Sequence, residues 1–314
     1  MITIDYDNKK SIREAFGKEL AVLGAKDSNI VVLDSDLSAS TQTKFFAKEY
    51  PERFYDCGIA EQGMIATASG LALTGKTAFA ATFAVFATGR TYDQVRVSVC
   101  YQNANVKIIG THGGITVGED GATHQALEDI SLMRGLPNMT VIVPADCEEC
   151  RQAVDYAASI KTPVYIRIAR NNLPDIYPQN YKFNPLKAYT IKEGKNLTIV
   201  SNGDVLAESI KAAEILSAKG IDAEVISLPV VKPLDTETIV KSAIKTGFVV
   251  TVENHSIIGG IGSAVSECLS EKHPTRVLRI GINDTFGQSG TASELLKYYG
   301  LDAEGIANRI IKAL

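Results

Sequence analysis

The sequence lacks the features that mark several classes of protein. No stretch of about 18 or more apolar residues is present, so no segment reads as a membrane-spanning helix. The first ten residues, MITIDYDNKK, contain no apolar signal-peptide core, and we expect no secretory signal. The formal net charge of −4 gives no electrostatic reason to expect binding to nucleic acid or to an anionic membrane.

Cysteine is scarce as well. The five cysteines form an odd, scattered set, which argues against a disulfide framework and favours a cytoplasmic location. Cys147 and Cys150 make a lone CxxC pair at the start of an apparent helix, without the second pair that zinc sites usually show. We therefore predict no metal ligand in this chain. GxSxG and P-loop patterns are also absent, so the sequence gives no reason to expect a Ser-His-Asp hydrolase or a P-loop nucleotide-binding protein.

What is present is typical of a globular α/β protein, with 45% hydrophobic and 22% charged residues. The length suggests two domains of roughly 150 residues each. Short apolar runs alternate with helix-period segments, as in parallel sheets covered by helices on both faces. The stretch 171–189 holds three prolines without periodicity and is interpreted as a linker. We predict two doubly wound α/β domains, 1–175 and 191–314, joined by a linker at 176–190.

Two segments of the first half carry an acidic residue and aromatic residues near predicted helix starts. In YDCGIAEQGM, Glu61 begins a helix, where it either stabilises the helix dipole or shares a proton with a ring nitrogen of a ligand. In TFAVFATGRTYDQVR, Phe83, Phe86 and Tyr92 are either core residues or stacking partners of a flat heterocycle.

A third segment, GTHGGITVGEDGATHQALED, is a glycine-rich loop that holds His112, Glu119, Asp120 and His124. A long polar loop after a buried strand is typical of a functional site, and a helix is predicted to follow near 124–134. The spacing matches no standard metal site. Histidines that titrate near neutrality suit proton transfer to sugar hydroxyls.

In chain order, these and further segments resemble the C-terminal half of transketolases, from about Ser11 to the last residue. The segments are DSDLSAS, FYDCGIAEQGM, TFAVF with RTYDQVR, THGGITVGEDGATHQ, PADCEE, YIRIARNNLP, VENHSIIGGIGSAV and GINDTFGQSG. The resemblance implies a pyrimidine-binding fold for thiamine diphosphate, followed by a transketolase C-terminal domain. It also implies transfer of a two-carbon ketol unit from a ketose phosphate to an aldose phosphate.

The resemblance assigns roles to single residues. Glu61 matches the catalytic glutamate that hydrogen-bonds the aminopyrimidine ring of the cofactor. Further positions match cofactor contacts, namely Phe83, Phe86, Asp36 and, across an alignment gap, Tyr92. His112 and His124 match catalytic histidines that contact substrate hydroxyls, and Asp120 matches an aspartate that reads the donor's stereochemistry. Three positions match the group that binds a sugar phosphate, which are Arg170, Arg13 and Ser40.

One departure from the family pattern concerns partners. Full-length members begin with a domain whose Gly-Asp-Gly motif and downstream Asn hold Mg²⁺ and the diphosphate, and this sequence contains no such motif. The resemblance therefore implies a separate N-terminal-half subunit that supplies the Mg²⁺ ligands and shares thiamine diphosphate with this chain. We expect a homodimer core within an α2β2 heterotetramer, and no activity from this chain alone.

Two alternatives stay open. The first is an E1 β-type subunit of a 2-oxo-acid dehydrogenase, or a deoxyxylulose-phosphate-synthase-like enzyme; the histidines around GEDG and Arg170 favour phosphorylated sugars over such pyruvate-like donors. The second is a non-catalytic thiamine-fold assembly partner. The presence of Glu61, His112, Asp120 and His124 argues against it.

In the second half of the chain we expect subunit contacts and no catalytic residue.

Overall fold

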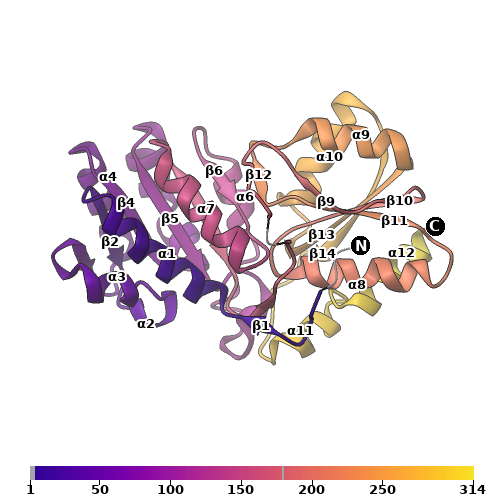
Figure 1. Cartoon of the computed structure of the whole chain (residues 1–314), viewed down its shortest axis with the longest axis horizontal. Coiled ribbons are helices and arrows are strands. Elements are labelled where there is room, and N and C mark those ends of the chain that lie inside the picture. The colour runs from indigo at the N-terminus through magenta and orange to yellow at the C-terminus, as the bar shows by residue number, and fades with distance from the viewer. Residues whose placement is uncertain (1–3, 179) are drawn as a thin grey trace.

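The computed structural model describes residues 4–178 and 180–314. Residues 1–3, at the start of the first predicted domain, and residue 179, in the predicted linker, lie outside the described residues. The chain forms two α/β domains that lie side by side along the long axis of the molecule (Figure 1). The predicted fold class is confirmed. Within the described ranges, no helix combines the length and apolar character needed to cross a membrane.

The first domain is built on a mostly parallel sheet with the strand order β12-β6-β7-β5-β4-β2-β3. The strands are β2 (Ile30–Asp34), β3 (Phe54–Asp56), β4 (Thr77–Phe83), β5 (Val106–Thr111), β6 (Thr140–Ile142), β7 (Val164–Ile168) and β12 (Val230–Lys232). The strands β2, β4, β5 and β7 are buried along their whole length, because helices cover both faces of the sheet.

The helices of the first domain form two layers. One layer contains α1 (Ile12–Lys26), α3 (Lys44–Glu49) and α7 (Cys147–Ser159), and the other contains α4 (Glu61–Leu73), the π-helical η3 (Val95–Tyr101) and α6 (Asp129–Arg134). Short segments complete the domain, namely α2 (Ser38–Thr41), η1 (Pro51–Arg53), the π-helical η2 (Phe86–Arg90), α5 (Tyr92–Gln94) and η4 (Ile115–Asp120). Helix α1 begins after Ser11 because the Ser11 hydroxyl accepts a hydrogen bond from the backbone N–H of Glu14.

The second domain repeats this architecture on a smaller sheet with the order β14-β13-β10-β11-β9. Its strands are β9 (Tyr189–Lys192), β10 (Leu197–Ser201), β11 (Ala223–Ser227), β13 (Phe248–Ser256) and β14 (Arg276–Ile282). Its helices are η5 (Gly203–Val205), α8 (Leu206–Ser217), α9 (Thr236–Thr246), α10 (Ile261–Lys272), α11 (Ala292–Tyr298) and α12 (Ala303–Ala313). Just before the predicted linker, β8 (Leu173–Pro174) pairs with β1 (Lys9–Lys10).

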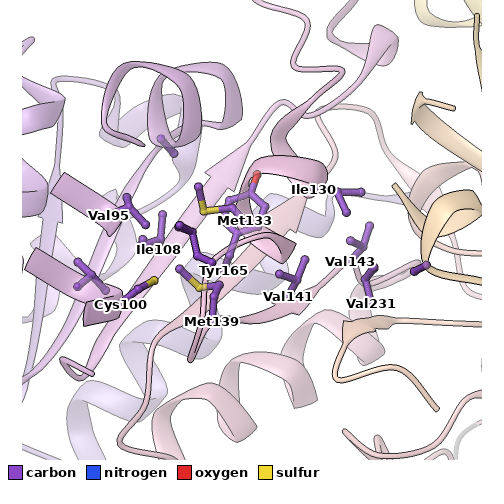
Figure 2. Packing of buried hydrophobic residues seen from close by; sticks show 14 of the residues in the cluster. Val95, Cys100, Ile108, Ile130, Met133, Met139, Val141, Val143, Tyr165 and Val231 are labelled. Atoms are coloured by element: carbon purple, nitrogen blue, oxygen red, sulfur yellow. The ribbon is translucent and has the colours of Figure 1, made fainter. Parts of the chain in front are cut away.

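A strand from the second half of the chain ties the two domains together. Strand β12 lies between β11 and α9 in the chain, yet it pairs antiparallel with β6 at the edge of the first sheet. Its Val231 packs beside Val141 and Val143 in a hydrophobic cluster that draws residues from both domains (Figure 2). Each large apolar side chain that is fully buried in such a cluster contributes about 1.5–3 kcal/mol. The two domains therefore share part of one core.

Candidate active site

The candidate site lies at the carboxyl ends of four neighbouring strands, β7, β5, β4 and β2. Arg170 follows β7, His112 follows β5, Phe83 ends β4 and Asp36 follows β2. Ligand sites in doubly wound sheets lie beyond this edge. The fold thus brings predicted site residues from four separate segments of the chain to one side of the first sheet.

Two of these residues have an unusual backbone conformation. Asp36 and His112 both have φ of 60°, in the left-handed region that residues other than glycine seldom adopt. Such conformations concentrate at functional sites. The Asp36 backbone N–H donates to Asp56 Oδ1 at 3.1 Å, and the same oxygen accepts the N–H of Gly58 at 2.9 Å. Asp56 therefore joins the loop of Asp36 to the loop that leads to Glu61.

Asp34, which sequence reasoning did not select as a site residue, anchors the loop that carries Ser40. Its buried carboxylate accepts hydrogen bonds from the N–H of Leu37 at 2.6 Å and from the hydroxyls of Thr41 and Thr43 at 2.7 and 2.8 Å. Burial raises the pKa of Asp34, and the three hydrogen bonds oppose this by lowering it. The run of hydroxyl residues after Asp34 in DSDLSASTQT was the signal for this anchor.

Glu61 begins α4 and is only 2% exposed. Arg90 Nη1 lies 2.8 Å from each of its carboxylate oxygens. The Arg90 guanidinium also lies over the ring of Phe86, with its carbon 4.3 Å from the ring centroid. Arg90 ends the π-helical segment η2, and π-helical turns are frequent at functional sites. Sequence reasoning missed Arg90 because no local pattern places it beside Glu61.

Aromatic rings form a wall next to this ion pair. The rings of Phe83 and Phe86 are stacked, with centroids 6.0 Å apart and an interplanar angle of 15°. His112 lies against Phe83 at 3.9 Å between centroids, and His124 meets Phe86 edge-on at 5.5 Å. The structure therefore brings both histidines and both phenylalanines together. Tyr92, at the start of α5, packs against the hydrophobic core.

His112 is held as a neutral imidazole. Burial, followed by the charges of Arg13, Arg170 and His124, lowers the pKa of His112 to about 3. The expectation of titration near neutrality is therefore wrong for this residue. Its Nδ1 lies 2.9 Å from the hydroxyl of Thr111. A neutral ring in this position can donate a hydrogen bond from one nitrogen and accept one at the other.

Two guanidinium groups, those of Arg13 and Arg170, lie near each other and near His112. Arg13 donates to the backbone carbonyl of Ser40 at 2.6 Å, and burial together with the nearby charge of Arg170 lowers the pKa of Arg13. Arg170 donates to the carbonyl of Val117 and contacts Glu119 Oε2 at 3.1 Å. Two like charges that repel each other form a favourable place for a phosphate, which guanidinium groups bind through charge-assisted hydrogen bonds.

The remaining predicted residue, Asp120, is exposed at the end of η4. Within residues 4–178 and 180–314, no group of three or more His, Cys, Asp or Glu side chains is arranged to hold a metal ion. The five cysteines, including Cys147 and Cys150, are free thiols.

Two family models match the chain. The model for the transketolase pyrimidine binding domain matches residues 8–175, and the model for the transketolase C-terminal domain matches residues 186–306. The chain belongs to the transketolase family, as its resemblance to that family implied.

Relatives of similar length carry transketolase names. A Methanocaldococcus jannaschii protein provisionally named a transketolase C-terminal section is 50% identical over 97% of this chain and 96% of its own length. A 6-deoxy-6-sulfo-D-fructose transketolase subunit of Clostridium sp. (strain MSTE9) is 43% identical over 94% of this chain and 92% of its own length.

Solved structures agree with this membership. A structure described as a split-gene transketolase in an inactive β4 tetramer is 50% identical to this chain, with a TM-score of 0.90, and the match covers 97% of this chain and 98% of that one. The transketolase of Campylobacter jejuni matches with a TM-score of 0.83 at 25% identity, over 98% of this chain but only 47% of its own.

Proposed function

We propose that this chain is the C-terminal subunit of a split transketolase, which transfers a two-carbon ketol unit from a ketose phosphate to an aldose phosphate with thiamine diphosphate. One observation carries the proposal. A single edge of the first sheet combines the buried carboxylate of Glu61, the wall of Phe83 and Phe86, and the neutral ring of His112. Two guanidinium groups complete this edge, so it offers partners for a heterocycle, a sugar and a phosphate.

The side chains fit the aminopyrimidine end of thiamine diphosphate. A stacked pair, Phe83 and Phe86, offers a flat apolar surface, and Glu61 beside it offers a buried carboxylate for a ring nitrogen. When bound, the cofactor supplies a carbon nucleophile and an electron sink for the broken carbon–carbon bond. Glu61 would share a proton with the ring nitrogen, and the two phenylalanines would exclude water from it. The Mg²⁺ ligands and the diphosphate contacts would come from the partner subunit.

The substrate would lie beside His112 and His124. A neutral His112 can accept a hydrogen bond from a sugar hydroxyl, which an imidazolium cannot, and its pKa of about 3 makes it a hydrogen-bonding partner of the sugar rather than its base. Arg13 and Arg170, with Ser40 next to them, would bind the sugar phosphate, and Asp120 would contact a donor hydroxyl. This cationic end favours phosphorylated sugars over the pyruvate-like donors of related enzymes.

The requirement for a partner is supported by the relatives. The split-gene transketolase structure is described as inactive when it is a β4 tetramer, and this chain matches it over nearly the full length of both chains. Apolar side chains are also exposed around α4 and η3, with Ile59, Leu73 and Tyr101 at 79%, 66% and 81%. Such exposed apolar residues suit a subunit contact. We propose a homodimer core within an α2β2 heterotetramer in the cytoplasm.

A coupled transketolase assay tests this function. Xylulose 5-phosphate and ribose 5-phosphate are supplied with thiamine diphosphate and Mg²⁺, and the chain is assayed alone and with an N-terminal-half transketolase subunit. We expect activity only in the pair, and a loss of at least about 100-fold with Glu61→Ala. Glu271→Ala, which removes an exposed acid of α10, is the matched control and leaves activity unchanged.

Two outcomes would contradict the proposal. Turnover by the purified chain alone would remove the need for a partner. A pair that is inactive with xylulose 5-phosphate but turns over pyruvate would instead indicate a 2-oxo-acid donor.

A further inference from the structure

The glycine-rich loop of residues 113–125, here called the substrate loop, is bound at its base by side chains of the second domain. Asn254, in β13, accepts the backbone N–H of Ile115 at 2.9 Å. It also donates to the hydroxyl of Thr116 at 3.1 Å and to Asp204 Oδ2 at 2.8 Å. The Thr116 hydroxyl in turn donates to the same Asp204 oxygen at 2.6 Å. These bonds join Thr116, Asp204 and Asn254 in a closed triangle.

The triangle is shielded from water. Thr116, Asp204 and Asn254 are 2%, 6% and 1% exposed. Hydrogen bonds in such surroundings are strong, and the loss of one partner leaves the others buried without it. Gly114 has φ of +79°, and a Cβ at this position would lie 2.4 Å from the side chain of Asn254. Glycine is thus required at position 114 for the close approach of the loop to β13.

The far end of the substrate loop is held in the same way. Gln125 donates through its amide to the backbone carbonyl of Gln288 at 2.9 Å, in the segment before α11. A Cβ added to Gly121 would lie 2.6 Å from Ser289 Oγ, so this segment also packs directly on the loop. Glu119 and Asp120, at the tip between these two anchors, are exposed. The loop therefore has a base fixed on the second domain and an exposed tip, where Glu119 contacts Arg170 of the site.

We infer that the second domain positions the substrate loop, with Asp204 and Asn254 as positioning residues that orient Asp120 and His124 toward the sugar. The identity of the ligand rests on the proposed function, whereas the anchoring rests on the hydrogen bonds alone. Neither positioning residue touches the substrate; both act through Thr116 and the loop backbone. The inference gives the second domain a part in sugar recognition.

Hydrogen exchange on the full chain without a partner tests the anchoring. Thr116→Val removes the hydroxyl but keeps the shape, and we expect exchange of the substrate-loop amides to rise about 10-fold as one buried hydrogen-bond network is broken. Thr116→Ser restores the hydroxyl and brings the rate back toward that of the wild type. Thr198→Val is the matched control, because Thr198 is a buried threonine of β10 whose hydroxyl contacts α9, away from the loop.

Kinetics of the complex with an N-terminal-half subunit test the consequence. We expect Thr116→Val, and Asp204→Asn if the first variant folds poorly, to raise KM for the sugar phosphates about 10-fold. The change in kcat is smaller, and the dissociation constant for thiamine diphosphate stays the same. A purely structural defect would instead lower kcat, KM and cofactor binding together, or would be reproduced by Thr198→Val, and either result would overturn the inference.

The two proposals fail in different ways. Unchanged loop exchange in both Thr116→Val and Asp204→Asn overturns the anchoring, whatever the enzyme turns over. Faster loop exchange, restored by Thr116→Ser, in a complex that shows no transketolase activity supports the anchoring and counts against the proposed function.

Discussion

Arg90 Nη1 lies 2.8 Å from both carboxylate oxygens of Glu61, so one cation of the chain covers the group that would face the cofactor. The contact is asymmetric, because the Arg90 side chain is 45% exposed and that of Glu61 only 3%. Loss of the arginine would leave a buried carboxylate without a counter-charge. Loss of the glutamate would leave the Arg90 guanidinium free to rotate toward the solvent and be hydrated there. A ring nitrogen that binds Glu61 must share at least one of these oxygens with Arg90 or displace it.

This asymmetry predicts the outcome of a double-mutant cycle. We expect Arg90→Gln to lower the free energy of unfolding by about 1–2 kcal/mol, since Arg90 is too exposed for the full effect of breaking a buried pair. Glu61→Gln should cost less, and the double variant should be no less stable than Arg90→Gln alone. Urea unfolding of the chain at pH 7 measures all four proteins. Strictly additive effects would show that the two side chains are not coupled.

The cationic end of the site predicts selectivity for phosphate. Arg170→Gln should raise KM for xylulose 5-phosphate about 10- to 100-fold, because charge-assisted hydrogen bonds contribute about 1.5–3 kcal/mol. KM for unphosphorylated xylulose should change little. Arg134→Gln, which breaks an ion pair with Glu267 away from the strand ends, is the control. An equal rise for both sugars would mean that Arg170 supports the site without binding phosphate.

The buried His112 predicts that the stability of the folded chain falls at acidic pH. Its pKa is about 3 in the folded chain, against 6.5 for an unperturbed histidine. Between these values the unfolded chain takes up a proton that the folded chain does not, so stability falls as the pH drops from 6.5 toward 3. We expect His112→Gln to flatten this fall, with His273→Gln as the control. In NMR spectra of labelled histidine, His112 should remain neutral down to pH 5; protonation near pH 6.5 would contradict the lowering of its pKa by burial.

The buried Lys107 predicts how the stability of the chain depends on pH on the alkaline side. It is fully buried in β5, its ammonium donates to the carbonyls of Ile160 and Thr162 at 2.9 and 2.6 Å, and burial lowers its pKa from 10.5 to about 7. Between pH 7 and 10.5 the unfolded chain holds a proton that the folded chain has lost, so stability rises with pH. Urea unfolding from pH 7 to 9 should show a rise of at most about 1.4 kcal/mol per pH unit, absent in Lys107→Met. An identical slope in both proteins would show that Lys107 keeps its proton.

Sequence patterns predicted the fold well where burial on both faces determines a strand. The apolar run at 77–83 coincides with β4, in which Ala78 and Ala80 pack into one hydrophobic cluster and Phe79 and Ala81 into the other. The helix predicted near 124–134 begins only at Asp129, because the preceding residues fold back, with His124 N–H bonded to Gly121 O, to complete the substrate loop. Tertiary contacts override the local pattern there.

The candidate site was predictable to the extent that it lies at strand ends. Asp36, Phe83 and His112 each follow or end an apolar run, so the parallel sheet alone places them together. Arg90 and Asp204 were not predictable in this way. Each meets its partner through contacts between distant segments, Arg90 across 29 positions and Asp204 across 88, and no local pattern encodes such a pairing.

Strand β12 limits how this protein can be divided. A gene fragment that ended before the second domain would leave β6 as a bare edge strand, with ladder groups open to pairing with another chain. Such a fragment should aggregate, although it would contain the whole of the match to the pyrimidine binding domain. Exchange of pyrimidine binding domains between family members would therefore have to include residues 230–232 as well, so the segment that must be exchanged together is longer than the match to that domain.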